Sequence, residues 1–268
     1  MRKNYRLLFA AFLRQKEGSS MFHGKDVMAI IPARWQSHRF PGKPLALIAG
    51  VPMIVRVWRQ VSRATLIHRT VIATDDERIA AVCRDHDMAC EMTSPAHQTG
   101  TDRLAEVASR HPADILVNVQ GDEPIIDPRS IDAVVHCLLA AREKGIEVAT
   151  GYIEGTTPEQ ESSPSSVQLV PTLDRCVLAF SRLPIPMSFS EPFQRNLHVG
   201  LHAFTRQALL RFATWPRGPV ERAESLELIR FLEYGQRIAC VPVQAGSIGV
   251  DHPEDIARVE AILHHSPR

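Results

Sequence analysis

Short apolar runs alternate with helical patterns along the first half of the chain. The runs are nearly all apolar, as strands buried on both faces of a parallel sheet are. Alternating strands and helices predict right-handed crossovers and a doubly wound α/β sheet. We expect strands at Val27–Pro32, Thr70–Thr74, Ala89–Met92 and Ile115–Val119, and helices at Met53–Arg63, Glu77–His86, Thr101–Arg110 and Pro128–Glu143.

The pattern changes after Gly151. Residues 154–166 (EGTTPEQESSPSS) are polar and rich in Ser, which predicts a loop, and a β-rich insert follows. Two parts, 21–150 and 151–268, are therefore expected to share one mixed sheet. In the second part we expect strands at Val167–Val170, Cys176–Phe180, His198–Phe204 and Arg237–Val243, and helices at Arg206–Ala213, Val220–Tyr234 and Pro253–Leu263.

Composition excludes some classes of protein. Lys plus Arg is 31 and Asp plus Glu is 30, so the chain lacks the basic excess of a general nucleic-acid binder. Five scattered cysteines without a CxxC pair indicate reduced thiols and a cytoplasmic location. Residues 1–20 have a basic start and an apolar run too short to span a bilayer, so we expect a flexible extension and no membrane partner.

The segment Ile30–Leu45 (IIPARWQSHRFPGKPL) carries the first candidate chemistry. A strand runs into a turn that bears Arg34, Arg39 and Lys43. Guanidinium groups grip phosphate oxygens as a fork and lysine acts as a point charge, at the strand end where open α/β sheets bind ligands. A nucleotide triphosphate is the expected ligand, and a basic surface loop is the alternative. We interpret 21–150 as a nucleotide-binding part and 151–268 as an acceptor-binding and dimerisation part.

Two acidic segments indicate a magnesium site. Asp122 follows an apolar strand in NVQGDEP, and Asp251 lies between a Gly-rich turn and a helix start in GSIGVDHPEDI. Mg²⁺ prefers carboxylate oxygens, so these two side chains would share a cation if the fold brings them together. Glu123 is expected to serve the turn or to lie behind the metal ligands without binding the ion, and Glu254 and Asp255 to serve the helix start. Solvated loop acids and an ordinary helix start are the alternatives.

Other motifs, present or absent, bear on which kind of binding or catalytic site the chain contains. HQTGTDR (97–103) is a polar loop that feeds a helix, in which Thr101 or Asp102 is expected to cap the first turn. No GxxxxGK[ST] or GxGxxG is present, which counts against a Walker-type loop and a dinucleotide site. No GxSxG or HExxH is present either.

Together, PARWQSHRFPGKPL, VIATDDERI, HQTGTDRLAEV, NVQGDEPII, FSRLPIP and GVDHPEDIARVE resemble the 3-deoxy-manno-octulosonate (Kdo) cytidylyltransferases, or CMP-Kdo synthetases, from about Val27 to Leu263. The resemblance implies a nucleotidyltransferase α/β fold, Mg²⁺ and a homodimer. It also implies transfer of CMP from CTP to a sugar acid with release of pyrophosphate. The residues it implies are Arg34, Arg39 and Lys43 for the phosphates; Pro32, Ala33, Thr74, Gly100 and Arg103 for the nucleotide; Asp122 and Asp251 for the metal; and Gln120, Arg182, His198 and Glu227 for the acceptor. Arg34, Lys43 and Asp122 would be catalytic.

The acceptor half departs from the family pattern. Gln168, Met187, His202 and Leu228 stand where the family commonly has Lys, Trp, Tyr and Gln. These positions leave the acceptor open between Kdo and another acidic acceptor, such as a variant ulosonate or a phosphonate. A non-enzymatic nucleotide-binding protein is the third alternative, and Arg34, Lys43, Asp122 and Asp251 argue against it.

Overall fold

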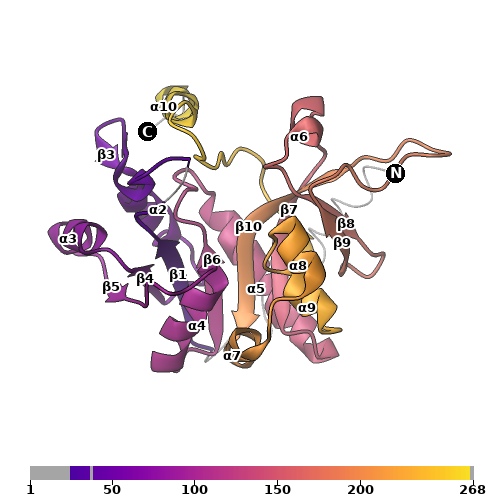
Figure 1. Ribbon diagram of the computed structural model, residues 1–268, viewed down its shortest axis with the longest axis horizontal. Coiled ribbons are helices and arrows are strands. Elements are labelled where there is room, and N and C mark those ends of the chain that lie inside the picture. The colour runs from indigo at the N-terminus through magenta and orange to yellow at the C-terminus, as the bar shows by residue number, and fades with distance from the viewer. Residues whose placement is uncertain (1–24, 37–38, 266–268) are drawn as a thin grey trace.

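The computed structural model describes residues 25–36 and 39–265, so the extension predicted at residues 1–20 lies outside the described part. Its main feature is one mixed sheet of nine strands, whose continuous path runs β11-β7-β10-β6-β1-β4-β5. Helices cover both faces of this sheet (Figure 1). The expected doubly wound α/β sheet, with a β-rich insert, is confirmed.

The first half supplies the parallel strands. They are β1 (Val27–Ala33), β4 (Arg69–Thr74), β5 (Cys90–Met92) and β6 (Ile115–Val119), close to the four predicted runs. β1 lies between β4 and β6 and pairs with both in parallel. The carboxyl ends of these strands therefore meet at one edge of the sheet, where ligands bind in open α/β folds.

Two layers of helices bury the apolar side chains of the sheet. On one face, α2 (Met53–Val61) and α5 (Pro128–Ala141) pack through residues such as Ile54, Val57 and Val134. On the other face, α4 (Gly100–Arg110) and α7 (Arg206–Thr214) pack through residues such as Leu104 and Phe212. α3 (Glu77–Asp85) lies beside β5 at the outer edge (Figure 1).

The second half completes the sheet with antiparallel pairs. β10 (Asn196–Thr205) lies between β6 and β7 (Val148–Glu154) and is antiparallel to both. β11 (Ala239–Pro242) is parallel to β7. β8 (Gln168–Pro171) and β9 (Val177–Ser181) branch from β10 as the insert, on the far side of the molecule from α3 (Figure 1).

Several elements differ from the sequence predictions. Strand β7 was not expected, because Gly151 and Thr150 interrupt its apolar pattern; a Cβ at Gly151 would lie 3.0 Å from the Val243 side chain, which packs closely there. The predicted boundary at residue 150 falls inside this strand. The short hairpin of β2 (Leu47–Ile48) and β3 (Val51–Pro52) was missed. So was α6 (Pro158–Ser162), which a capping box of Thr157 and Gln160 starts inside the predicted polar loop.

The helix predicted at Val220–Tyr234 is wrong. It is two short helices, α8 (Pro219–Glu224) and α9 (Ile229–Glu233). Ser225 ends α8 in the left-handed region with φ 52°, which breaks the helical path. The break places Glu227 on the connection between the two helices.

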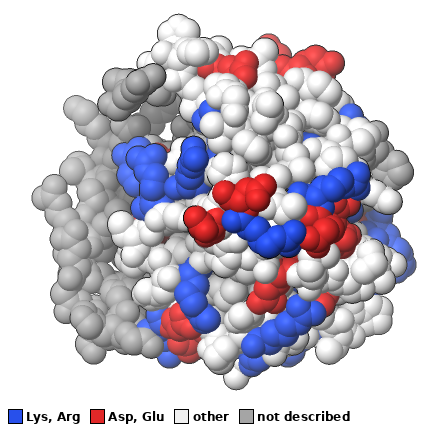
Figure 2. Space-filling model, turned by 90° about the vertical axis from the view of Figure 1, so that its left-hand side faces the viewer, with Lys and Arg blue, Asp and Glu red and all other residues white. Residues whose placement is uncertain are grey.

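The last helix, α10 (Asp255–His265), packs near the hairpin through a small cluster of Ile48, Met53, Val250 and Val259. Within the described residues, no helix is long and apolar enough to cross a membrane. On the face turned to the viewer in Figure 2, basic and acidic side chains lie beside one another.

Candidate active site

The loop after β1 presents the three expected cations to one cavity. Gly42 adopts the left-handed conformation at φ 70°, which starts a short 3-10 turn at Lys43–Leu45. Arg34, Arg39 and Lys43 line a cavity of about 210 Å³, named here the cationic cavity. Among the described residues Arg34 forms no ion pair, so its guanidinium is available to a ligand. The remaining lining residues are Pro32, Ala33, Pro44, His97, Thr99, Gly100, Arg103, Gln120, Gly121, Asp122, Glu227 and Asp251.

Asp122 and Asp251 meet at Lys43. Lys43 Nζ lies 2.5 Å from Asp122 Oδ2 and 3.6 Å from Asp251 Oδ1. Arg39 Nη2 lies 2.9 Å from the same oxygen of Asp251. Two carboxylates from distant parts of the chain therefore face the same position, and the Lys43 ammonium occupies it.

Contacts between the 121–126 turn and the 247–255 segment place Asp251. Val250 N donates to Asp122 O at 2.9 Å, and the Ser247 hydroxyl donates to Glu123. Asp255 accepts from the backbone N–H groups of Asp251 and His252, as expected for an acid at a helix start. Burial, with the charges of Asp122 and Asp251 adding to it, raises the pKa of Glu123 to about 7. Glu123 therefore ties the two segments together.

A second cavity, of about 530 Å³, continues from the cationic cavity and is named here the outer cavity. Both cavities are lined by Arg34, Arg39, His97 and Arg103. Asp75 holds Arg103 through Nη2 at 2.9 Å. Thr74 is fully buried and lines neither cavity; its hydroxyl accepts from Asp76 N. The outer cavity is completed by Trp35, Gln36, Asp75, Asp76 and Pro95.

A third cavity, of about 680 Å³, lies on the other side of Gln120, Asp122, Glu227 and Asp251. It is named here the histidine cavity because His198 and His202 line it. The two rings stack at 5.2 Å between centroids. Thr150 Oγ1 lies 2.9 Å from His198 Nε2, 3.0 Å from His202 Nδ1 and 3.2 Å from the carbonyl of Leu201.

One tautomer assignment satisfies all three contacts of Thr150. A hydroxyl has one proton and two lone pairs, and the Leu201 carbonyl can only accept. The hydroxyl therefore donates to Leu201, and both imidazole N–H groups donate to Thr150. His198 Nδ1 and His202 Nε2 keep their lone pairs as hydrogen-bond acceptors, which suits the hydroxyl groups of a sugar.

Burial keeps both histidines neutral. It lowers the pKa of His198 well below its ordinary value and that of His202 from 6.5 to about 4. A histidine whose pKa is lowered by folding stabilises the protein fully above its unfolded pKa, and this stability is lost as the pH falls toward the folded value. As the pH is lowered from 6.5 to 4, we expect the free energy of unfolding to fall by up to about 3 kcal/mol more in the wild type than in the His202→Asn variant. Urea unfolding of both proteins across this range measures the difference, and parallel curves would contradict it.

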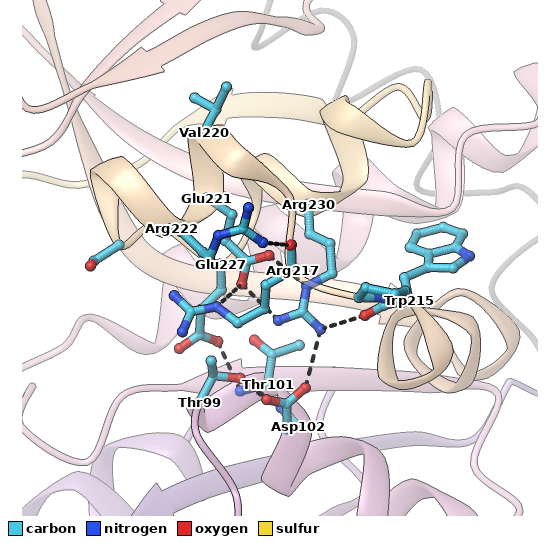
Figure 3. Close-up of polar contacts among 12 residues, drawn as sticks. Thr99, Thr101, Asp102, Trp215, Arg217, Val220, Glu221, Arg222, Glu227 and Arg230 are labelled. Carbon is cyan, nitrogen blue, oxygen red and sulfur yellow. Dashed lines mark hydrogen bonds and ion pairs between the residues drawn. The ribbon is translucent and has the colours of Figure 1, made fainter.

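Glu227 lies on the wall between the cationic and histidine cavities. Its carboxylate accepts from Gly100 N at 3.1 Å and Thr101 N at 2.8 Å, at the start of α4. Thr99 caps this helix by accepting from Asp102 N, so the prediction of Thr101 or Asp102 as the cap is wrong. Asp102 accepts from Thr99 and from Arg230 of α9 (Figure 3).

Three other residues expected near the acceptor lie elsewhere. Arg182 donates to the carbonyls of Pro164 and Glu224, at 2.8 and 2.7 Å, and does not line the three cavities. Its guanidinium braces the segment that carries Ser163 and Ser165 at the rim of the histidine cavity. Gln168 is buried outside these cavities, and Met187 is 78% exposed. Of the four departures from the family pattern, only His202 and Leu228 line the histidine cavity.

Sequence reasoning missed two groups that shape the site. Thr150 lies on the strand that was not predicted, and nothing in its local pattern marks it as a partner of two histidines. Glu123 was expected in the turn or behind the metal ligands, but its contact with Ser247 could not be foreseen, because Ser247 lies on a segment far along the chain. Both roles come from strand neighbours and loop contacts.

Comparisons with known proteins agree with this geometry. Residues 28–238 match the model of the cytidylyltransferase family. The 3-deoxy-manno-octulosonate cytidylyltransferase of Geobacter sulfurreducens is 44% identical over 246 residues, which cover 87% of this chain and 98% of that protein. The enzyme of the same name from Solibacter usitatus is 42% identical, over 90% of this chain and 96% of its own length.

Solved structures give the same result. A CMP:2-keto-3-deoxy-manno-octonic acid synthetase complexed with CTP superposes with a TM-score of 0.84 at 35% identity, over 90% of this chain and 99% of that one. A 4-diphosphocytidyl-2C-methyl-D-erythritol synthase from Anaerococcus prevotii covers 92% of this chain and 100% of its own, with a TM-score of 0.63 at 13% identity, and shares the fold. The chain belongs to the cytidylyltransferase family, among the 3-deoxy-manno-octulosonate cytidylyltransferases.

Proposed function

We propose that this protein transfers CMP from CTP to 3-deoxy-manno-octulosonate and releases pyrophosphate. One observation carries the proposal: the cationic and histidine cavities share a wall formed by Gln120, Asp122, Glu227 and Asp251. A nucleotide on one side and an acceptor on the other would meet at the two aspartates. The relatives named above, and the neighbour complexed with CTP, support both ligands.

The cationic and outer cavities together suit a nucleoside triphosphate. Arg34, Arg39 and Lys43 supply three positive charges on one loop, and Arg103 adds a fourth that Asp75 already pairs. We place the phosphates against Arg34 and Lys43, with Pro32, Ala33 and Gly100 beside the nucleotide. Arg39 pairs with Asp251 through a side chain that is 54% exposed, so this ion pair costs little to exchange for a phosphate.

Asp122 and Asp251 fit a magnesium ion. Mg²⁺ keeps several waters and is usually held by one or two carboxylates together with substrate phosphates. Within the described residues no three His, Cys, Asp or Glu side chains are grouped so that they could hold a metal by themselves, so this pair of aspartates would need phosphate oxygens and waters as further ligands. When bound, the ion would supply positive charge to the phosphate oxygens. Without a bound ion, the Lys43 ammonium pairs with both carboxylates.

The reaction would be an in-line attack by an oxygen of the acceptor on the α-phosphorus of CTP. Negative charge would grow on the α-phosphate and on the departing pyrophosphate, and Arg34 and Lys43 would offset it. The neutral His198 and His202 would accept hydrogen bonds from acceptor hydroxyls. Gln120, on the shared wall, would orient the acceptor. No protein base is assigned.

Removal of divalent metal tests the role of the aspartate pair. We expect saturating EDTA to abolish pyrophosphate release from CTP and Kdo, and added MgCl₂ to restore it, because Asp122 and Asp251 would otherwise remain paired with Lys43 and Arg39. Isothermal titration of MgCl₂ in the presence of CTP should give binding in the wild type. Full activity in EDTA would contradict the metal role.

A panel of three acidic compounds tests which acceptor the protein uses. Pyrophosphate release from CTP is measured with Kdo, a variant ulosonate and a small phosphonate. We expect Kdo to give the highest kcat/KM. The second candidate is the same transfer to another acidic acceptor, which is favoured by His202 and Leu228 inside the histidine cavity. A phosphonate or variant ulosonate that exceeds Kdo would establish that candidate.

We also propose that the protein works as a homodimer in the cytoplasm. Apolar side chains are exposed on the insert and on the segment after it, including Leu178 at 65% and Phe189 at 89%, and a subunit interface would cover them. All five cysteines are free thiols, as expected in a reducing compartment. Light scattering after size-exclusion chromatography measures the mass, and a monomer at micromolar concentration would contradict the dimer.

A further inference from the structure

Trp35 closes the loop that carries the phosphate-binding cations. Its carbonyl accepts from Gly42 N at 3.0 Å, which joins the two ends of the loop. Its indole ring lies against Gly42, where a Cβ would come 3.0 Å from Trp35 Cη2. The ring also packs against the apolar core that includes Ile54 and Val57 of α2. Arg34 precedes this tryptophan and Lys43 follows Gly42, so both cations are attached directly to the closure.

Arg78 fixes the same ring from outside. Its guanidinium carbon lies 3.5 Å from the centroid of the Trp35 ring, within the range of a cation–π contact. Asp76, which caps α3, accepts from Arg78 Nε at 2.9 Å and Nη2 at 2.7 Å. The guanidinium is therefore oriented by the end of β4 and the start of α3.

We propose that Trp35 is a positioning residue for the nucleotide. Together, Gly42, Trp35, Arg78 and Asp76 form a clasp that sets the spacing of Arg34 and Lys43 in the cationic cavity. The proposal rests on the proposed function, because it takes the triphosphate of CTP as the ligand of these cations. Neither Arg78 nor the Trp35–Gly42 contact is part of the wall against the acceptor.

The clasp matters because Arg34, unlike Lys43, has no ion pair within the described residues to hold its side chain. Arg34 is exposed and the Arg39 side chain is 54% exposed, so the backbone of the loop determines where their charges lie. A displacement of about 1 Å from the productive geometry costs on the order of 100-fold in rate when reacting groups are prepositioned. Loss of the indole ring removes contacts at both Gly42 and Arg78.

The test compares Trp35→Ala, Trp35→Phe and Arg78→Met with the control Trp58→Ala. Trp58 is also a half-buried tryptophan packed on the same core, and it lines none of the three cavities. KM for CTP, KM for Kdo, kcat and Tm are measured for each, with CTP affinity by calorimetry. We expect Trp35→Ala to raise KM for CTP roughly 10- to 100-fold and to leave KM for Kdo nearly unchanged.

The other variants separate positioning from packing. Trp35→Phe keeps an aromatic face and should recover most of the CTP affinity. Arg78→Met should raise KM for CTP several-fold with an unchanged Tm, because Arg78 is exposed. Trp58→Ala should lower Tm without raising KM for CTP. A Trp35→Ala protein with the KM of the wild type, or a Trp58→Ala protein that loses CTP affinity equally, overturns the clasp.

The same variants also cover two other results, a Trp35→Ala protein that does not fold and a wild-type protein that does not bind CTP. If Trp35→Ala does not fold, Arg78→Met decides, and an unchanged KM for CTP there overturns the proposal. Failure of the proposed function would appear differently, as a wild-type protein that binds no CTP.

Discussion

Replacing Asp122 with Asn reduces kcat by about 100- to 1,000-fold, which is the usual cost of removing one group that stabilises charge in the transition state. Asn keeps the shape of the side chain but not its charge. It would no longer supply a carboxylate to a divalent ion shared with Asp251, and Lys43 would lose the ion pair that it forms at 2.5 Å. The free energy of unfolding should change by about 1 kcal/mol or less, because Asp122 is partly exposed and Lys43 keeps Asp251.

Asp127→Asn provides the matched control. Asp127 caps α5 by accepting from Arg129 N and lines none of the three cavities, and Asn caps helices as well as Asp does. Steady-state pyrophosphate release and urea unfolding are measured for both variants. Near-normal kcat in Asp122→Asn would remove Asp122 from the mechanism, and a large loss of stability would make its effect on activity uninformative, in which case Asp251→Asn is measured.

Replacing Glu221 with Gln destabilises the fold by about 3–5 kcal/mol, as expected when one partner of a buried ion pair is removed. Glu221 is fully buried, and its carboxylate accepts from Arg230 Nε at 2.7 Å and Nη2 at 2.6 Å (Figure 3). Burial opposes the charge on Arg230, but the hydrogen bonds and charge of Glu221 outweigh it, so the pKa of Arg230 lies above its ordinary value. Without Glu221 the guanidinium remains buried with weaker partners.

The buried pair also supports the site. Arg230 Nη1 reaches Asp102 at 3.3 Å and the carbonyl of Phe212 at 3.2 Å, and its guanidinium carbon lies 3.8 Å from the centroid of the Phe212 ring. These contacts hold α9 against the start of α4, where Glu227 meets Gly100 and Thr101. We therefore expect the Glu221→Gln protein to bind CTP and acceptor more weakly even below its unfolding temperature.

A double variant distinguishes charge burial from simple packing. Glu221→Leu with Arg230→Met replaces both ions with apolar groups and should recover part of the stability lost by Glu221→Gln. Asp174→Asn is the control, because Asp174 and Arg237 form an exposed pair whose loss should change little. The urea concentration at the midpoint of unfolding is measured for the double variant, for Glu221→Gln and for Asp174→Asn. A Glu221→Gln protein as stable as Asp174→Asn would contradict the prediction.

Local sequence patterns predicted most of the fold correctly. The apolar runs of β1 and β6, and residues 71–74 of β4, are buried in the sheet, and short runs of this kind are typical of parallel strands covered on both faces. Asp76 and Asp127 cap α3 and α5 through contacts with neighbouring residues, so helix starts of this kind can be read from local sequence. The break at Ser225 was missed because the apolar pattern of α8 and α9 continues across it, and only the left-handed backbone separates them.

The sequence by itself determined which residue types carry the chemistry. Arg34, Arg39 and Lys43 lie on one short loop, so their proximity follows from the chain. Asp122 and Asp251 lie far apart in sequence, and their meeting at Lys43 depends on Val250 N binding Asp122 O and Ser247 binding Glu123. Likewise, His198 and His202 are neutral because the packed fold buries them, and β7 places Thr150 between their ring nitrogens. Local patterns encode strands, helices and caps, whereas contacts between distant segments depend on how those elements pack.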